Sequence, residues 1–226
     1  MFNPNGLQML YSMTSEKTLA KWAMHPDRGE VMQQVFYDQH KLAITSGIKP
    51  PLTAPLHNLL CEISELALHD PLADVMPLSG LHFTFFAITM PIYQRTDIAD
   101  IDPYLLAIFA RQAKNHRVTI SNLRLVALPN QLLIAGTPDV KSYEAKEAFV
   151  RQLLDSPWRD KLCERHGDIP LPPPFWHSTL LRYQADFLPA RYREYFMAHQ
   201  GDNYGDISSA VRLAFTNYNW TEMYDC

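Results

Sequence analysis

Two short motifs combine side chains that can move protons with side chains that can bind phosphate. His82 is followed two positions later by Thr84 in "HFTF", and His177 by Thr179 in "HSTLLR". Of the nine histidines, these two have threonine at that spacing. Two imidazoles can serve as general acid and general base near neutral pH, and hydroxyls can donate to phosphoryl oxygens. Such a set could act on a phosphate ester without a metal or another cofactor, provided that both motifs face one cleft.

Both motifs occur in segments that are typical of β-strands. "LHFTFFAITM" and "FWHSTLLRY" are rich in aromatic and β-branched residues. Side chains alternate between the two faces of a strand, so His82 and Thr84 should share one face, as should His177 and Thr179. If the two strands face each other, two imidazoles and two hydroxyls converge.

The same alternation makes predictions for two neighbouring side chains. Phe86 should lie on the cleft face, where a nucleobase could stack on it. Arg182 is suited to phosphate recognition, but strict alternation places it on the face opposite His177. Whether Arg182 contacts the substrate or forms a structural ion pair stays open at this point.

The order of elements after Gly80 predicts how the motifs are positioned. The strand with His82 is followed by a helix, a two-stranded hairpin, a helix broken near Pro157, the strand with His177, a helix and a final strand. Nearly the same order of strands and helices therefore occurs twice in succession, once after each motif histidine. We therefore expect an α+β fold of two lobes around a central cleft, each lobe a sheet backed by helices. The expected ranges are 81–90, 101–116, 117–128, 132–138, 140–167, 175–183, 188–200 and 208–218.

The N-terminal third lacks clear strand signals. Helices are expected over residues 15–24 with Ser15 as cap, over 28–47 and over 56–70. These segments predict a helical N-terminal extension over residues 1–77, followed by a bilobal domain over residues 78–226.

The paired motifs resemble those of the 2H phosphoesterase superfamily, which has two H-x-[ST]-x motifs on strands of a duplicated lobe. The second is often extended to H-x-T-L-x-R, and "HSTLLR" matches that form at every fixed position. The resemblance covers about residues 78–220. The sequence departs from the family where "FFAITMP" follows the first motif and where Trp176, in place of the usual proline, precedes the second histidine.

The resemblance implies both roles and an activity. His82 and His177 would form the acid/base pair, while Thr84 and Thr179 would hold phosphate, with Arg182 as a further contact. The expected enzyme is a metal-independent phosphodiesterase acting on a 2′,3′-cyclic phosphate or a 2′-5′ linkage. Its partner would be a small nucleotide or an RNA end.

Two alternatives remain. One is a nucleotide-binding or interaction module that has the same fold but no turnover. The other is a metal-dependent phosphohydrolase that uses His57, His69 and Asp70 of "HNLLCEISELALHDP". The alternation of strands and helices after Gly80 disfavours the metal site, because such sites lie in all-helical bundles.

Composition limits the partners. The net charge of −4 argues against long duplex nucleic acid, and no apolar run is long enough to span a membrane. Apolar residues make up 47% and charged residues 19% of the chain, the balance of a globular domain. Three scattered cysteines, Cys61, Cys163 and Cys226, and the lack of a signal-peptide pattern favour the reducing cytoplasm.

Overall fold

A computed structural model describes residues 2–34, 36–38, 40–98, 101–114 and 116–226. It has two antiparallel sheets, one with strand order β3-β1-β8-β9 and one with β2-β6-β5-β4-β7. The predicted fold class, an α+β fold of two lobes each built from a sheet and helices, is confirmed. The helices are α1 (Pro4–Met24), α2 (Ala54–Leu66), α3 (Pro103–Gln112), α4 (Val140–Leu154), α5 (Arg159–His166) and α6 (Ala190–His199), with short 3-10 turns at Leu78–Gly80 and Arg95–Asp97. The strands are β1 (Ala43–Ile48), β2 (Ala73–Val75), β3 (Phe83–Ala87), β4 (Arg117–Leu128), β5 (Gln131–Pro138), β6 (His177–Tyr183), β7 (Ile207–Ala210), β8 (Arg212–Thr216) and β9 (Met223–Asp225).

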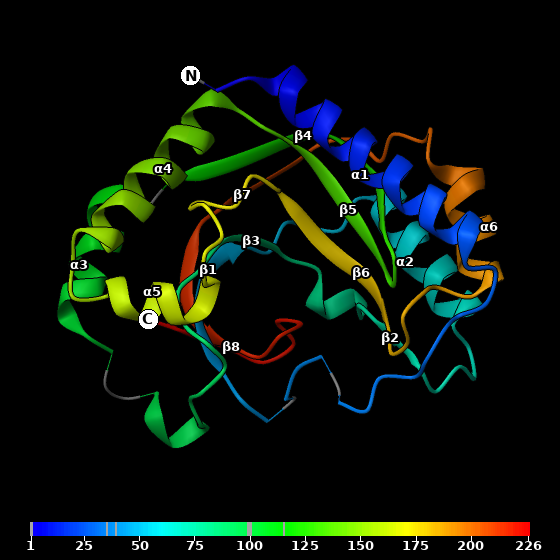
Figure 1. The fold of residues 1–226 in the computed structure, drawn as a ribbon. Helices are drawn as coiled ribbons and strands as arrows, with labels where there is room; N and C mark the ends of the chain where they lie inside the picture. Colours follow the sequence, from blue (N-terminus) through cyan, green and yellow to red (C-terminus); the bar gives the residue numbers. More distant parts are fainter. Residues whose placement is uncertain (1, 35, 39, 99–100, 115) are drawn as a thin grey trace.

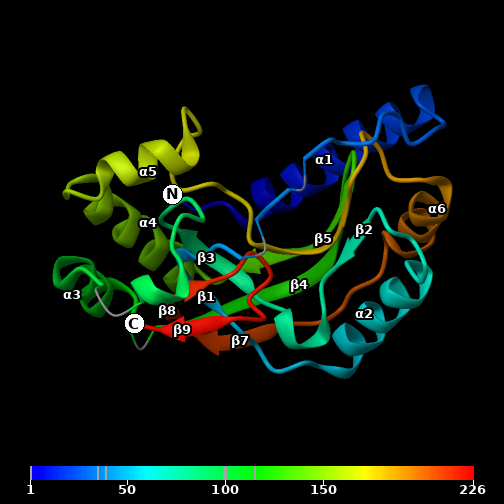
Figure 2. The same ribbon diagram turned by 90° about the horizontal axis from the view of Figure 1, so that it is seen from below.

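The helices form two groups. Helices α1, α2 and α6 contact strands of the five-stranded sheet, whereas α4 contacts β3 and β4, one strand of each sheet, and also contacts α3. Figure 1 shows these two groups on opposite sides of the molecule, and Figure 2 shows the strands between them. No described helix combines the length and the apolar character needed to cross a lipid bilayer.

Helix α1 begins earlier than predicted. Asn3 caps it by accepting a hydrogen bond from the Gly6 amide at 3.1 Å, and Pro4 occupies the first turn, where a missing amide proton costs nothing. Ser15, predicted as the cap, lies inside the helix and is buried, where its hydroxyl accepts from the Ala127 amide. The capping prediction for Ser15 is therefore wrong, because the helix extends from a stronger start signal upstream.

Helix α1 is fixed to the β4–β5 hairpin by buried side-chain donors. The Tyr11 hydroxyl donates to the Gly136 carbonyl at 2.9 Å, and the Thr18 hydroxyl donates to the Ala127 carbonyl at 2.9 Å. These buried polar groups are thus paired, so the helix is held in one orientation on the sheet.

The helix predicted over residues 28–47 is wrong. Its end forms strand β1, which lies between β3 and β8 and is buried along nearly its whole length. A strand covered on both faces loses the alternation of apolar and polar residues by which strands are recognised. Val35 of this segment lies outside the described residues. Residues from the expected N-terminal extension therefore form part of the same sheet as the first motif.

Several predicted elements after Gly80 are confirmed. Strands β4 and β5 pair as an antiparallel hairpin, and the helical segment after it divides into α4 and α5 around Pro157. The final strand expected over 208–218 is instead two strands in different sheets. Strand β7 pairs with β4, β8 pairs with β1, and Val211 alone separates them.

An aromatic cluster connects the two motif strands. Phe85 of β3 meets Trp176 edge-on at a centroid distance of 5.8 Å, and it lies 6.1 Å from Phe149 of α4. All three side chains are almost fully buried. Because Trp176 directly precedes His177, this cluster fixes the second motif relative to the first.

Candidate active site

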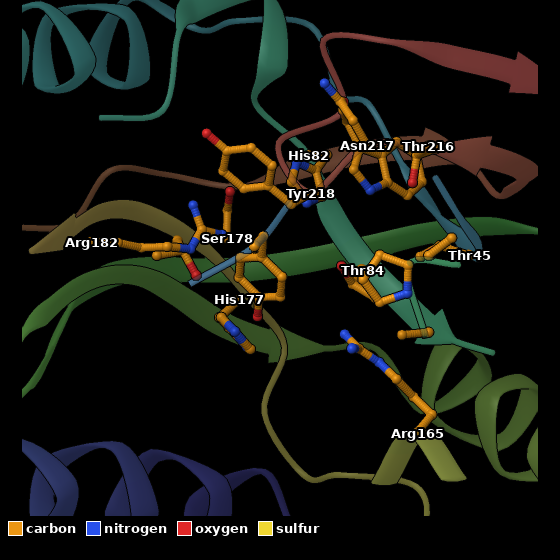
Figure 3. A pocket seen from close by; sticks show the side chains of 16 residues that line it. Thr45, His82, Thr84, Arg165, His177, Ser178, Arg182, Thr216, Asn217 and Tyr218 are labelled. Atoms are coloured by element: carbon orange, nitrogen blue, oxygen red, sulfur yellow. The ribbon is translucent and has the colours of Figure 1, made fainter. Parts of the chain in front are cut away.

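One cavity of about 280 Å³ is lined by both motif strands. His82 and Thr84 reach it from the first motif and His177 and Thr179 from the second, together with Arg182. Figure 3 shows a close view of this space with the side chains that surround it. The sequence-predicted pairs are therefore brought together, although β3 and β6 belong to different sheets.

Matching β-bulges shape the two motif strands. In β3, Thr84 pairs with Gly47 and Phe86 with Ser46, so Phe85 is the extra residue. In β6, Thr179 pairs with Leu133 and Leu181 with Leu132, so Leu180 is the extra residue. Both extra residues come three positions after the motif histidine. A bulge reverses which face the following side chains occupy, so strict alternation fails beyond it.

The bulge in β6 answers the question of Arg182. Strict alternation places this residue opposite His177, but the extra residue Leu180 returns it to the cavity side. The corresponding position in β3, also five residues after the histidine, is Ala87, and it too lines the cavity. The second motif thus has a cation where the first has a methyl group.

The bulge in β3 turns Phe86 away from the cavity. Its side chain is buried and stacks on the His166 ring at a centroid distance of 5.0 Å, with Phe149 edge-on at 6.5 Å. The prediction that Phe86 lies on the cleft face is therefore wrong. The physical reason is the extra residue Phe85, which the sequence pattern does not reveal.

The environment of His82 fixes its orientation and its tautomer. Its Nδ1 lies 2.8 Å from the Gly80 carbonyl oxygen and donates to it, which leaves Nε2 with the free lone pair. The ring stacks on Trp220 at 4.9 Å. Burial lowers the pKa of His82 to about 3, against a smaller opposite effect of the Gly80 carbonyl.

His177 is positioned by a contact from helix α1. The Trp176 amide donates to the Tyr11 hydroxyl at 3.1 Å, directly before the histidine. Burial lowers the pKa of His177 to about 4, with smaller contributions from the positive charges of Lys146 and Arg182. Burial thus favours the neutral form of both imidazoles, whereas the sequence alone predicts titration near neutral pH.

Arg182 lies beside two tyrosines that sequence reasoning missed and whose rings stack on each other at a centroid distance of 5.5 Å. Its guanidinium carbon lies 5.4 Å from the Tyr37 ring centroid and 5.3 Å from that of Tyr218. Its Nη1 also lies 3.5 Å from an Asp74 carboxylate oxygen, and the Tyr218 hydroxyl donates to the same carboxylate at 3.1 Å. These contacts orient a planar cation at the side of the cavity.

Further lining residues come from segments without a motif. Thr45 of β1, Thr216 of β8, Asn217 and Arg165 of α5 also line the cavity. Among the described residues, the buried Ser178 Oγ and His177 Nδ1 have no hydrogen-bond partner in the chain. The polar side chains that line the cavity are available to a bound molecule. No sequence motif identified Arg165 or the two tyrosines, because they are distant from the motifs in sequence and come close to them only in the folded chain.

Two of the three residues of the alternative metal site have other partners. Asp70 forms an ion pair with Arg191 and accepts from the Tyr192 hydroxyl at 3.0 Å, while His57 approaches Cys61 on α2. Within the described ranges, no three histidine, cysteine or acidic side chains are grouped so as to hold a metal ion.

Comparison with known proteins finds similarity among solved structures. No family model matches the sequence, and no curated protein matches it. The structure of TT0787 of Thermus thermophilus is 14% identical over 81% of this chain and 97% of that one, with a TM-score of 0.43. Escherichia coli LigT complexed with 3′-AMP is 12% identical over 82% and 94% of the two chains, with a TM-score of 0.47. A structure described as a phosphoesterase is 12% identical over 81% and 94%, with a TM-score of 0.39.

Proposed function

We propose that the protein is a phosphodiesterase that hydrolyses a 2′,3′-cyclic phosphate or a 2′-5′ linkage of a nucleotide or short RNA by two-histidine acid/base catalysis. The observation that carries this proposal is the meeting of His82 and His177, from different sheets, in one cavity with Thr84, Thr179 and Arg182. The three unpaired cysteines suit the reducing cytoplasm as its location.

In the proposed reaction His82 acts as the base. Its Nδ1–H is directed to the Gly80 carbonyl, so Nε2 can accept a proton from the attacking water. The water oxygen forms a bond to phosphorus, the bond from phosphorus to the leaving ribose oxygen breaks, and His177 donates a proton to that oxygen. In the reverse reaction the two histidines exchange roles.

Binding of the anionic substrate should protonate the histidine that acts as the acid. Burial keeps the pKa of His82 at about 3 and that of His177 at about 4, so an acid must be created on binding. A phosphate anion between the rings favours the protonated imidazole by charge attraction and raises both pKa values. We therefore expect His177 to take up its proton together with the anionic substrate.

The remaining polar groups serve the phosphoryl oxygens. The hydroxyls of Thr84 and Thr179 can donate to them, and the Arg182 guanidinium offers charged donors from the same strand as His177. These donors would stabilise the charge that develops on the phosphoryl group in the transition state. The two imidazoles and these donors suffice for hydrolysis, so we propose that no metal takes part.

The test is turnover by the purified protein in the presence of a chelator. The substrates are the four nucleoside 2′,3′-cyclic phosphates and 2′-5′-linked dinucleotides, with 3′-5′-linked dinucleotides as the matched control. His82→Ala and His177→Ala should each reduce kcat by roughly 100-fold or more. His199→Ala, which changes a histidine at the end of α6, should leave kcat unchanged.

Failure to cleave any of these substrates, combined with nucleotide binding, would favour the non-catalytic binding module instead. Hydrolysis that persists unchanged in both motif variants would show that another site is responsible. Activity that is lost with chelator and restored by a divalent ion would support the metal-dependent alternative.

A further inference from the structure

Arg165 is held beside the first motif by its neighbour in helix α5. The His166 Nε2 donates to the Ala87 carbonyl at 2.8 Å, and the His166 ring stacks on Phe86 at 5.0 Å and 17°. Both contacts join the C-terminal turn of α5 to the end of β3. The backbone of Arg165 is thereby fixed next to Ala87, and its side chain extends into the cavity (Figure 3).

The cavity floor at this place is small and polar. Ala87 pairs across the sheet with Thr45, and both side chains line the cavity. Ala43 and Thr216 pair farther along the same sheet and also line it. Ala87 occupies the position that corresponds to Arg182 in the second motif, so the space that a large side chain would fill here is open to a ligand group.

The guanidinium of Arg165 is available to such a group. In the described part of the chain it has one polar contact, an approach of Nη1 to Met90 Sδ at 3.7 Å, and no carboxylate partner. No acidic residue is among the described residues that line the cavity. A cation without a counter-charge in such a place favours the binding of an anion.

Arg165 and Arg182 serve different parts of the cavity. The positive charge of Arg182 contributes to the low pKa of both His82 and His177. The two side chains come from α5 and β6 and enter from different sides in Figure 3. A phosphate placed between the histidines therefore falls within reach of Arg182, which leaves Arg165 for a different anionic group.

We propose that Arg165, with the Thr45 hydroxyl, binds a second phosphate group of the substrate. For its substrate class this inference rests on the proposed function. The preferred substrate is then a 2′-5′-linked or cyclic-phosphate-ended nucleotide that carries at least one phosphate besides the one that is cleaved, rather than a simple nucleoside cyclic phosphate. Arg165 determines specificity and takes no part in proton transfer.

The experiment compares paired ligands in matched variants. Turnover is measured on a 2′-5′-linked diadenosine without terminal phosphate, with a 5′-phosphate and with a 3′-phosphate. Binding is measured separately by calorimetry with adenosine 3′-monophosphate and adenosine 3′,5′-bisphosphate. The variants are Arg165→Ala and Arg159→Ala, the latter removing a positive charge from an exposed position of the same helix.

We expect the wild type to prefer a ligand with the additional phosphate by roughly tenfold or more, as a charge-assisted contact provides. Arg165→Ala should abolish that preference and leave the ligands with one phosphate unaffected, while Arg159→Ala should retain it. A wild type without preference, or an Arg165→Ala variant that weakens all ligands equally, would overturn the inference.

The two proposals can fail separately. If nothing is hydrolysed but the preference for the bisphosphate disappears in Arg165→Ala, the phosphodiesterase proposal fails and the second anion site stands. If cleavage depends on both histidines but no ligand pair responds to Arg165→Ala, the phosphodiesterase proposal stands and the second anion site is refuted.

Discussion

The imidazole of His82 lies nearly parallel to the indole of Trp220, with an interplanar angle of 7° and a centroid distance of 4.9 Å. Gly47 of β1 also approaches this indole, and a Cβ atom there would lie 2.6 Å from Trp220 Cη2 and 2.8 Å from the Phe83 carbonyl oxygen. The plane of the first motif histidine is therefore set in part by a glycine in the neighbouring strand. This close approach gives Gly47 a reason to lack a side chain.

Gly47→Ala should displace Trp220 and with it the ring of His82. We expect kcat to fall by roughly 10- to 100-fold, because small misplacements of a catalytic group are costly. Overpacking should also reduce the free energy of unfolding by about 1–3 kcal/mol. Steady-state kinetics and urea unfolding measure the two effects. Gly201→Ala, where nothing lies within 4 Å of the added atom, is the control. A folded Gly47→Ala variant with wild-type kcat would refute the role of Trp220.

The histidine pair should make stability depend on pH. Folding lowers the pKa from 6.5 to about 3 in His82 and to about 4 in His177, so below pH 6.5 the unfolded chain binds protons that the folded chain does not. Above pH 6.5 these histidines do not affect the free energy of unfolding. As the pH falls from 6.5 toward 4, proton binding to the unfolded chain progressively lowers it. Urea unfolding at pH 7, 5.5 and 4.5 measures the loss. A His82→Gln/His177→Gln variant should have a flatter profile, and an equal slope in both proteins would contradict the assignment.

Lys146 offers a way to change the pKa of His177 without touching the cavity wall. Its ammonium is buried, donates to the Pro173 carbonyl at 3.0 Å and lies 4.5 Å from the Trp176 ring centroid. Its charge contributes to the low pKa of His177. Lys146→Met removes that charge at similar volume, so the pKa of His177 should rise above about 4. The imidazole resonances, followed by NMR during acid titration, report the change, with Lys141→Met on the same helix as control. An unchanged midpoint in Lys146→Met would refute this coupling.

Arg182 should not be replaceable by lysine. A lysine keeps the charge but cannot present a flat, forked cation beside the stacked rings of Tyr37 and Tyr218. We expect Arg182→Lys to reduce kcat/KM by roughly 10- to 100-fold, as for the loss of one oriented donor to a phosphoryl oxygen. Asp74→Asn, which weakens the 3.5 Å ion pair but retains the ring contacts, should have a smaller effect. Equal activity of the lysine variant would indicate that only the charge matters.

Local sequence patterns were sufficient to predict those helices and strands whose boundaries are marked by turn residues or proline. The β4–β5 hairpin has a turn sequence between two β-rich segments, and Pro157 interrupts a helical pattern where α4 gives way to α5. The two motifs could be paired because each histidine has its threonine on the same strand. Strand β1 could not be recognised in the same way, since it is buried by partners that are distant in sequence.

The wrong placement of Phe86 and the open question of Arg182 share one cause. Both residues lie beyond a bulge, and a bulge is a property of two paired strands rather than of one sequence segment. Tyr37, Tyr218 and Arg165 were missed for a related reason, because a loop residue or a helix end becomes part of a site only when the chain is folded. Residue types and spacing therefore predicted the reacting groups better than their surroundings.

The single residue between β7 and β8 has a mechanical consequence. Val211 is buried, and the strands on either side of it belong to different sheets. A connection this short cannot act as a long hinge, so the two lobes have little freedom to open and close by a hinge motion. The spacing of the two imidazoles should then be the same before and after a ligand binds, and the rate at which ligands reach them should depend on surface loops rather than on movement of the lobes.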